Sequence, residues 1–250
     1  MPSAMPSATS RQTVLPAPTE KAAQVRRMFS SIAPRYDLLN HLLSLNIDKL
    51  WRRRAVNRLG WEREPEGTYL DNCAGTLDLA VELARRPGFR GRVVGSDFTF
   101  AMLERGQDKV ARLPVSSACA DALALPYPDR TFDGSTVGFG VRNLADLDAG
   151  LRESARVLKP GARLVILEFT TPTWQPFRGM YFFYFLRVLP LVGRMVSKHS
   201  SAYTYLPESV LGFPEPPELA ERMRAAGFDE VGWTTLSGGI AAIHWGTKRP

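Results

Sequence analysis

The pattern of apolar and polar positions predicts helices at the start of the chain. The first runs from Glu20 to Ile32, where apolar residues recur at i, i+3, i+4 and i+7 from Val25 onward and form one stripe. Pro34 ends this helix. A second helical region extends from about Leu38 to Leu59. Together they form an N-terminal helical segment, residues 20–60.

Beyond this segment, strand patterns alternate with helix patterns. Such alternation is typical of a mostly parallel sheet with helices on both faces, an α/β fold. The last strands, within residues 229–248, meet at "SGG" and predict an antiparallel hairpin. The other predicted elements are strand 68–73, helix 78–86, strand 91–98, helix 100–113, strand 131–141, helix 144–158, a turn and strand in 159–170, and helix 217–226.

Residues 172–205 form an aromatic insertion. Its stretch "FRGMYFFYFLRVLPLVGRMV", residues 177–196, is interrupted by three arginines and by Pro190, so we expect no helix that spans a bilayer. Two interpretations stay open: a buried pair of helices, or a helix that contacts lipid.

Composition narrows the class of protein. The chain has 250 residues, of which 44% are hydrophobic and 23% charged, as expected for one soluble domain over residues 20–250. Residues 1–19 are rich in Pro, Ser and Ala and predict a disordered tail. Two separate cysteines and three scattered histidines indicate neither a disulfide framework nor a metal site. A net charge of +7 is compatible with nucleic acid, an anionic membrane or an anionic ligand.

The stretch "YLDNCAGTLDLA", residues 69–80, has the strand–turn–helix layout of a nucleotide-binding loop. A dinucleotide site has the motif G-x-G-x-x-G, but Cys73, Gly75 and Asp78 occupy those three positions. An acidic residue that opens the helix repels phosphate. The loop therefore favours a cofactor that has no phosphate.

Two further carboxylates suggest which cofactor this is. Asp97 ends the next strand, where it can accept hydrogen bonds from both ribose hydroxyls. Asp121 follows a short apolar segment, where it can accept from an adenine amino group. Ribose and adenine recognition without a phosphate site point to S-adenosylmethionine.

Long stretches of the chain resemble the UbiE-type C-methyltransferases, which methylate the quinol ring in menaquinone and ubiquinone synthesis. The resemblance extends from about residue 20 to residue 248. It implies a class I S-adenosylmethionine-dependent methyltransferase with a Rossmann-like fold. The matching stretches are "MFSSIAPRYDLLNHLLSLNIDKLWRRRAV", "ALPYPDRTFDGSTVGFGVRNLADLDAGLRESARVLKPGARLVILEF", "AYTYLPESV", "AAGF" and "LSGGIAAIHWGTK".

The resemblance also implies site residues. The cofactor contacts of the family fall on Thr76, Asp97, Asp121 and Ala122. A further contact, a serine in the family, falls on Gly138, which has no side chain to make it.

For the substrate, the resemblance implies that Arg142 and Asn143 orient or deprotonate the ring hydroxyl. Tyr36 and Asp37 belong to the N-terminal segment that forms a lid over the pocket.

The chain departs from the family at Leu77, where the family has glycine. If this position needs a positive φ, a leucine is strained by roughly 1–2 kcal/mol. Such a loss weakens cofactor binding about tenfold. We expect a modest shift of the loop that preserves binding.

The expected chemistry needs a phenolate and an in-line methyl transfer. Arg142 is a poor base, because its guanidinium stays protonated, and we expect it to stabilise the oxyanion while water carries the proton. The alternative for Arg142 and Asn143 is a strand-end cap with a surface charge. His199 is an alternative base; His41 and His244 are weaker candidates.

These interpretations imply partners and a location. The substrate is a prenylated demethylmenaquinol, with a ubiquinone-pathway benzoquinol as an alternative. The aromatic insertion and Arg52, Arg53 and Arg54 predict peripheral contact with the inner face of the membrane from the cytoplasm. For these arginines a solvated helix face is the alternative. No nucleic acid is expected, and a homodimer stays open.

Two rival functions remain at this point. One is a methyltransferase that acts on another small molecule or on RNA. The other is a non-catalytic relic of the fold that has lost its cofactor.

Overall fold

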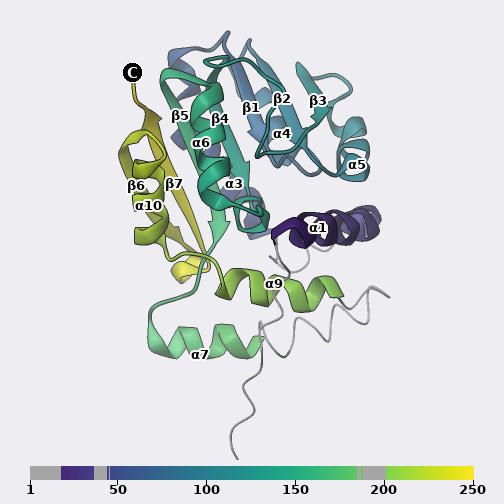
Figure 1. Ribbon diagram of the computed structural model, residues 1–250, viewed down its shortest axis with the longest axis vertical. Helices are drawn as coiled ribbons and strands as arrows, with labels where there is room; N and C mark the ends of the chain where they lie inside the picture. The colour runs from purple at the N-terminus through teal and green to yellow at the C-terminus, as the bar shows by residue number, and fades with distance from the viewer. Residues whose placement is uncertain (1–17, 37–43, 45, 185–186, 188–200) are drawn as a thin grey trace, which may run out of the picture.

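A seven-stranded sheet runs through the computed structural model, which describes residues 18–36, 44, 46–184, 187 and 201–250 (Figure 1). Its strand order is β3-β2-β1-β4-β5-β7-β6. Strands β1 to β5 are parallel, whereas β7 is antiparallel to both β5 and β6. The strands are β1 (Thr68–Asn72), β2 (Arg92–Asp97), β3 (Val115–Cys119), β4 (Phe132–Gly138), β5 (Leu158–Phe169), β6 (Phe228–Leu236) and β7 (Ala241–Lys248).

Helices cover both faces of this sheet. The α-helices are α1 (Pro18–Ile32), α3 (Ile47–Leu59), α4 (Asp78–Ala84), α5 (Phe100–Val110), α6 (Leu147–Val157), α7 (Gln175–Phe183), α9 (Ser201–Leu211) and α10 (Pro216–Ala225). Short 3-10 helices are η1 (Ala33–Arg35), η2 (Trp61–Arg63), η3 (Val141–Asn143) and η5 (Ser237–Gly239).

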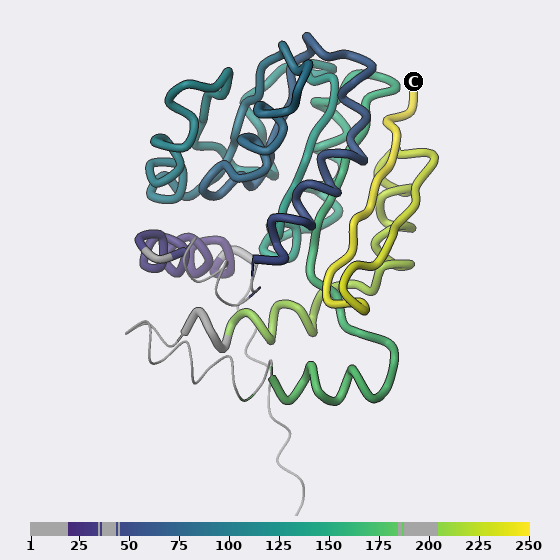
Figure 2. The backbone as a smooth tube through the Cα atoms, turned by 180° about the vertical axis from the view of Figure 1, so that it is seen from behind, coloured from purple at the N-terminus to yellow at the C-terminus, as the bar shows by residue number. Residues whose placement is uncertain are grey.

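The alternation of side chains along the strands creates two cores. In β5, Val165 and Leu167 face one side and pack with α3, α4 and α5, whereas Leu164 and Ile166 face the other and pack with α6 and α10. All four are fully buried. Figure 2 shows α3 lying across the first of these faces. A strand buried on both faces reads as a continuous apolar run, as "RLVILEF" does.

Three helices lie beyond the carboxyl ends of the parallel strands. Figure 1 shows α1 under these strand ends, α9 beneath it and α7 farthest from the sheet. Helix α7 buries Tyr181, while Trp174, Met180 and Phe183 are each more than 60% exposed. The interpretation of the insertion as a buried helix pair is therefore wrong for α7. Residues 185–186 and 188–200 of the insertion lie outside the described residues.

The structure confirms the predicted strand–helix alternation and the C-terminal antiparallel pair. It differs at β3, which no prediction included, because its residues "VSSAC" are short, polar and half exposed at the sheet edge. Of the helical region predicted from about Leu38 to Leu59, the structure describes α3 from Ile47 onward, after Asn46 with a left-handed φ of 63°. Residues 37–43 and 45 lie outside the described residues. Of the predicted tail, residues 1–17 lie outside the described part of the chain.

Candidate functional site

The loop after β1 alternates between backbone conformations. Cys73, Gly75 and Leu77 have positive φ values of 54°, 53° and 67°. Gly75 is the one for which this conformation carries no steric cost. The amide N–H of Gly75 donates to Asp97 Oδ2 at 2.9 Å, which ties the loop to the end of β2.

Leu77 adopts the left-handed conformation that would strain a leucine at this position. Its side chain, however, points away from the cofactor position. The side chain is fully buried, and its two methyl groups lie over Gly95 and Gly106. A Cβ at Gly95 would lie 2.2 Å from Leu77 Cδ2, and a Cβ at Gly106 would lie 2.9 Å from Cδ1. The leucine thus packs between β2 and α5 below the loop, where two glycines leave room for it.

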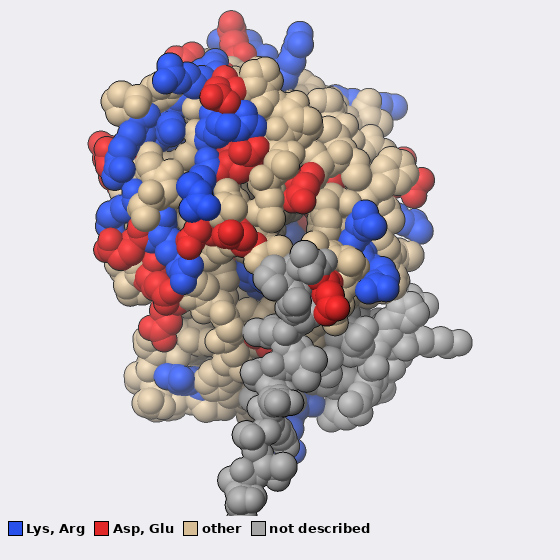
Figure 3. All heavy atoms as spheres, in the orientation of Figure 1, with Lys and Arg blue, Asp and Glu red and all other residues tan. Residues whose placement is uncertain are grey.

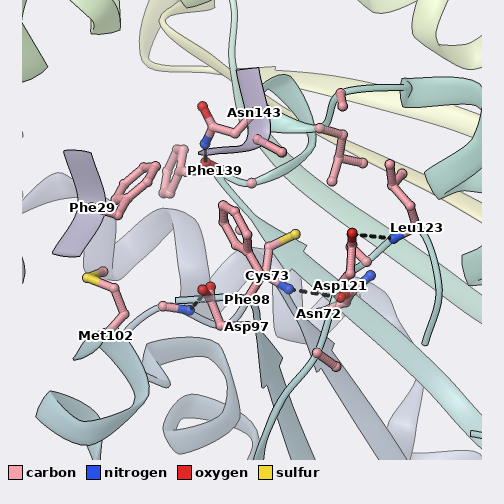
Figure 4. A pocket seen from close by; sticks show the side chains of 18 of the residues that line it. Phe29, Asn72, Cys73, Asp97, Phe98, Met102, Asp121, Leu123, Phe139 and Asn143 are labelled. Carbon is pink, nitrogen blue, oxygen red and sulfur yellow. Dashed lines mark hydrogen bonds between the residues drawn. The ribbon is translucent and has the colours of Figure 1, made fainter. Parts of the chain in front are cut away.

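Above the loop lies an open cavity, with about 730 Å³ of empty space when the solvent at its mouth is included. Figure 4 shows the rings of Phe29, Phe98 and Phe139 around it, with the carboxylates of Asp97 and Asp121 facing the same space. The cavity sits at the carboxyl ends of β1, β2 and β4, where open α/β sheets bind their ligands.

Three of the four predicted cofactor residues line this cavity: Asp97, Asp121 and Ala122. Asp97 is buried, and its Oδ1 also accepts from Thr99 N at 2.8 Å. Burial raises the pKa of Asp97, while these backbone donors favour its ionised form. Asp121 is exposed, and its Oδ1 accepts from Leu123 N at 2.9 Å. Each carboxylate keeps lone pairs for a ligand.

Thr76, the fourth predicted cofactor residue, is buried and is not among the residues that line the cavity. Its hydroxyl accepts from Lys109 Nζ at 3.0 Å. Lys109 also binds Asp78 at 2.7 Å, and Arg52 lies 3.3 Å from the other oxygen of Asp78. The negative charge of Asp78 is therefore balanced by two cations. The sequence argument that Asp78 would repel a phosphate does not hold for this arrangement.

Arg52 itself departs from both sequence interpretations. Neither a solvated helix face nor lipid headgroups surround it, because its side chain is buried and paired with Asp48 and Asp78. Its neighbours Arg53 and Arg54 are exposed.

Gly138 lines the cavity at the end of β4. A Cβ added there would lie 2.7 Å from Leu79 Cδ1. The serine of the family does not fit this position unless Leu79 moves.

The two predicted catalytic residues occupy the η3 turn, Val141–Asn143, directly after β4. Arg142 is 7% exposed, and its NH1 lies 2.5 Å from Glu168 Oε1, near the carboxyl end of β5. NH1 also donates to Phe139 O at 2.6 Å, and the guanidinium lies 5.3 Å from the centre of the Phe169 ring. Arg142 is thus a buried, paired cation, so the alternative of a surface charge is wrong.

Asn143 lines the cavity, and its Nδ2 donates to Phe139 O at 3.3 Å (Figure 4). Its Oδ1 accepts from Tyr205 Oη of α9 at 3.0 Å. From α1, Lys21 Nζ donates to the carbonyls of Arg142 at 3.2 Å and Leu144 at 2.7 Å. Side chains from three separate elements, β5, α9 and α1, therefore hold the η3 turn.

Sequence reasoning missed Glu168, Tyr205 and Lys21. A sequence signal existed for Glu168, an acid inside the apolar run "LVILEF", since a carboxylate is buried in such a run only with a partner. Nothing local marks Tyr205 or Lys21, which are 62 and 121 residues away from their partners in η3.

The lid and histidine predictions fall partly on described residues. Tyr36 lines the cavity, whereas Asp37, His41 and His199 lie outside the described residues. His244 is buried in β7, where its Nε2 lies 3.1 Å from Pro216 O. Burial lowers the pKa of His244 to about 4. His244 does not line the cavity.

The residues of the cavity suit S-adenosylmethionine. Among the described residues that line it there is no lysine or arginine to pair with a phosphate, but there are two acids and several aromatic and aliphatic side chains. Acids and apolar surface match a nucleoside that carries a positive sulfur. Asp97 would hold the ribose and Asp121 the amino group of the adenine, with Ala122 beside them in the cavity wall.

The sequence comparisons agree with this chemistry. The ubiE/COQ5 methyltransferase family matches residues 18–248. A Geobacter sulfurreducens protein, "Ubiquinone/menaquinone biosynthesis C-methyltransferase UbiE", is 47% identical and aligns over 92% of this chain and 90% of its own length. A Deinococcus radiodurans protein, "Demethylmenaquinone methyltransferase", is 47% identical over 92% of this chain and 95% of its own.

A solved structure supports the fold at low sequence identity. It is an S-adenosylmethionine-dependent methyltransferase from Thermotoga maritima, described as a possible histamine N-methyltransferase, with a TM-score of 0.63 and 20% identity over 89% of this chain and 99% of that one. Since the family match covers nearly the whole chain and the cavity fits the cofactor, the chain belongs to the ubiE/COQ5 methyltransferase family and is an S-adenosylmethionine-dependent methyltransferase.

Proposed function

We propose that the enzyme methylates a ring carbon of a prenylated demethylmenaquinol, which yields menaquinol. The observation that carries this proposal is the identity of 45–47% to relatives named demethylmenaquinone methyltransferase, over at least 90% of this chain. Other relatives are named for both the ubiquinone and menaquinone pathways, so a benzoquinol is the second candidate substrate.

The residues around the η3 turn suit carbon methylation. Bound S-adenosylmethionine supplies an electrophilic methyl group. A ring carbon becomes nucleophilic enough when the neighbouring hydroxyl loses its proton, and a fixed positive charge favours that phenolate. Arg142 supplies the charge from a position next to Asn143, because Arg142 itself is not among the residues that line the cavity. Its Nε is buried and has no hydrogen-bond partner in the described part of the chain.

Glu168 is the negative partner that offsets the cost of burying the charged guanidinium of Arg142. Both its oxygens accept hydrogen bonds from Arg142, one of them also from Phe169 N at 2.9 Å. Burial raises the pKa of Glu168, which the neighbouring Arg142 opposes. The pair fixes the guanidinium beside Asn143. The proton of the ring hydroxyl leaves through water, because a guanidinium does not accept it.

The enzyme is also proposed to work at a membrane surface. On the face that Figure 3 displays, charged side chains gather over the upper part of the molecule, and the lower part around α7 is mostly uncharged. Trp174, Met180 and Phe183 of this region are exposed, with Arg178 beside them. This combination suits peripheral contact with an anionic inner membrane leaflet, where a prenylated substrate resides. No helix among the described residues is long and apolar enough to span a bilayer.

The test of the proposed function is methyl transfer from labelled S-adenosylmethionine to demethylmenaquinol by the purified protein. The double variant Arg142→Met/Glu168→Gln removes the charge without leaving Glu168 unpaired. We expect it to lower kcat by about 10²-fold to 10³-fold with an unchanged cofactor Kd. Arg152→Met, at an exposed arginine on α6, is the control.

Two results would contradict the proposal. Methylation of RNA but not of the quinol would point to the first rival function. The absence of any calorimetric signal with S-adenosylmethionine at high micromolar concentration would point to the non-catalytic relic.

A further inference from the structure

Tyr205 connects helix α9 to the cavity through one hydrogen bond. Its Oη lies 3.0 Å from Asn143 Oδ1, with 62 residues of chain between the two. Tyr205 is half-buried, and burial raises the pKa of its hydroxyl. The phenol therefore keeps its proton and donates to the amide oxygen.

This bond completes the orientation of the Asn143 side chain. The amide nitrogen donates to Phe139 O, and the amide oxygen accepts from Tyr205. With one bond at each end, the amide plane is fixed, and one N–H remains available to a ligand in the cavity. Without Tyr205 the oxygen end has no partner among the described residues.

Helix α9 belongs to an apolar layer that it forms with α7. Tyr181 of α7 and Val210 of α9 are the buried residues of this layer, and Phe182 and Leu206 pack around them. Figure 1 shows α9 between α7 and the strand ends. A ligand that packs against the layer therefore acts on the helix that carries Tyr205.

We infer that Tyr205 is a positioning residue that couples occupation of the α7–α9 layer by an apolar substrate tail to the orientation of Asn143. The inference rests on the proposed function, because it needs a substrate with a ring for the cavity and a tail for the layer. Contacts of the tail with α7 and α9 stabilise the position of α9 in which the phenol holds the amide of Asn143.

Such coupling makes the tail contribute to kcat. Binding energy of a remote part of a substrate raises kcat when it aligns the catalytic groups, so a truncated substrate loses kcat and not merely affinity. Tyr205 is the connection through which the α7–α9 layer would exert this effect on Asn143.

The test compares Tyr205→Phe with the wild type on two demethylated naphthoquinols, one with a single isoprene unit and one with a long prenyl tail. Phenylalanine keeps the ring and removes only the hydroxyl. We expect the wild type to have a kcat about tenfold higher with the long tail, and the variant to lose this advantage. The KM for the long-tailed quinol and the Kd for S-adenosylmethionine stay within about twofold.

Ser209→Ala is the matched control, since Ser209 lies on the same helix and makes a local bond to Leu206 O. It should keep the dependence of kcat on tail length. An equal loss of kcat by Tyr205→Phe on both quinols, or a wild-type kcat that ignores tail length, overturns the inference and leaves the proposed function intact. A wild type that methylates neither quinol overturns both.

Discussion

Leu77 combines an unfavourable backbone conformation with a well-packed side chain. Its φ of 67° costs a non-glycine residue about 1–2 kcal/mol, but its buried side chain fills the space over Gly95 and Gly106. The strain is a matter of folding stability, because the side chain does not line the cavity. A leucine is therefore compatible with an intact cofactor site.

Because of this balance, we expect the glycine variant at position 77 to be more stable than the alanine variant, the reverse of the usual order. Leu77→Ala removes the packing and keeps the strain, and we expect it to lower the free energy of unfolding by about 2–5 kcal/mol. Leu77→Gly also relieves the strain and should be about 1 kcal/mol more stable than Leu77→Ala, although glycine is ordinarily the less stable of the two. Urea denaturation measures both. A gain in cofactor affinity of tenfold or more in either variant would show instead that Leu77 obstructs the site.

The buried imidazole of His244 makes stability depend on pH. Burial lowers its pKa to about 4 from about 6.5 in the unfolded chain. Below pH 6.5 the unfolded state binds a proton that the folded state excludes, so stability is lost as pH falls from 6.5 toward 4, by about 3 kcal/mol in all.

His244→Gln keeps a side-chain donor for Pro216 O but does not titrate. Unfolding free energies measured between pH 7 and pH 4.5 should therefore fall less steeply in this variant than in the wild type. Parallel curves for the two proteins would mean that other groups account for the pH dependence.

At the scale of elements, Arg52 fastens helix α3 to the start of α4. It pairs with Asp48 on its own helix and lies 3.3 Å from Asp78, the first residue of α4. Asp48 is also buried and accepts from Ser44 Oγ at 2.6 Å. Removal of the arginine would take from this buried carboxylate the cation that lies one turn along the same helix, at position i+4.

We expect Arg52→Met to lower the free energy of unfolding by about 3–5 kcal/mol. Arg53→Met, one residue along the same helix but exposed, should change it by less than about 0.5 kcal/mol. Chemical denaturation of the two variants checks the difference. Equal, small losses would indicate that the Arg52 pairs are weak.

The sequence predicts elements well where apolar periodicity is strong, and poorly where conformation depends on neighbours. Strand β5 and helix α6 follow from their patterns, whereas β3 is held by pairing with β2 and has little apolar signal of its own. The predicted strand 131–141 runs into the first residue of the η3 turn, although β4 ends at Gly138. Short polar segments derive their structure from tertiary contacts.

At the scale of the whole molecule, the candidate site forms at the carboxyl ends of the strands, and this much follows from sequence. Asp97 could be placed because it ends a predicted strand, and Asp121 because it follows a short apolar segment. The roles of Thr76 and Asp78 could not be predicted, because both residues bind Lys109. That lysine lies 33 residues beyond Thr76 and 31 residues beyond Asp78. A side chain that a distant cation binds cannot be assigned from its local motif.

The proposed membrane contact predicts a specific loss of vesicle binding. Trp174→Ser/Phe183→Ser removes two large exposed apolar side chains from α7 and its N-terminal flank, and should weaken association with anionic vesicles by at least about tenfold. Phe100→Ser, at a phenylalanine that is 66% exposed at the start of α5, is the control and should bind as the wild type does. Sedimentation with vesicles measures both. Equal losses would argue for non-specific adsorption.

Lys21 connects helix α1, which forms one wall of the cavity, to the η3 turn. Its helix supplies Ala22 and Phe29 to the wall of the cavity, and Lys21 itself grips the carbonyls of Arg142 and Leu144. An outward movement of α1 would break both hydrogen bonds. Opening this wall of the cavity would therefore also loosen the turn that carries Arg142 and Asn143.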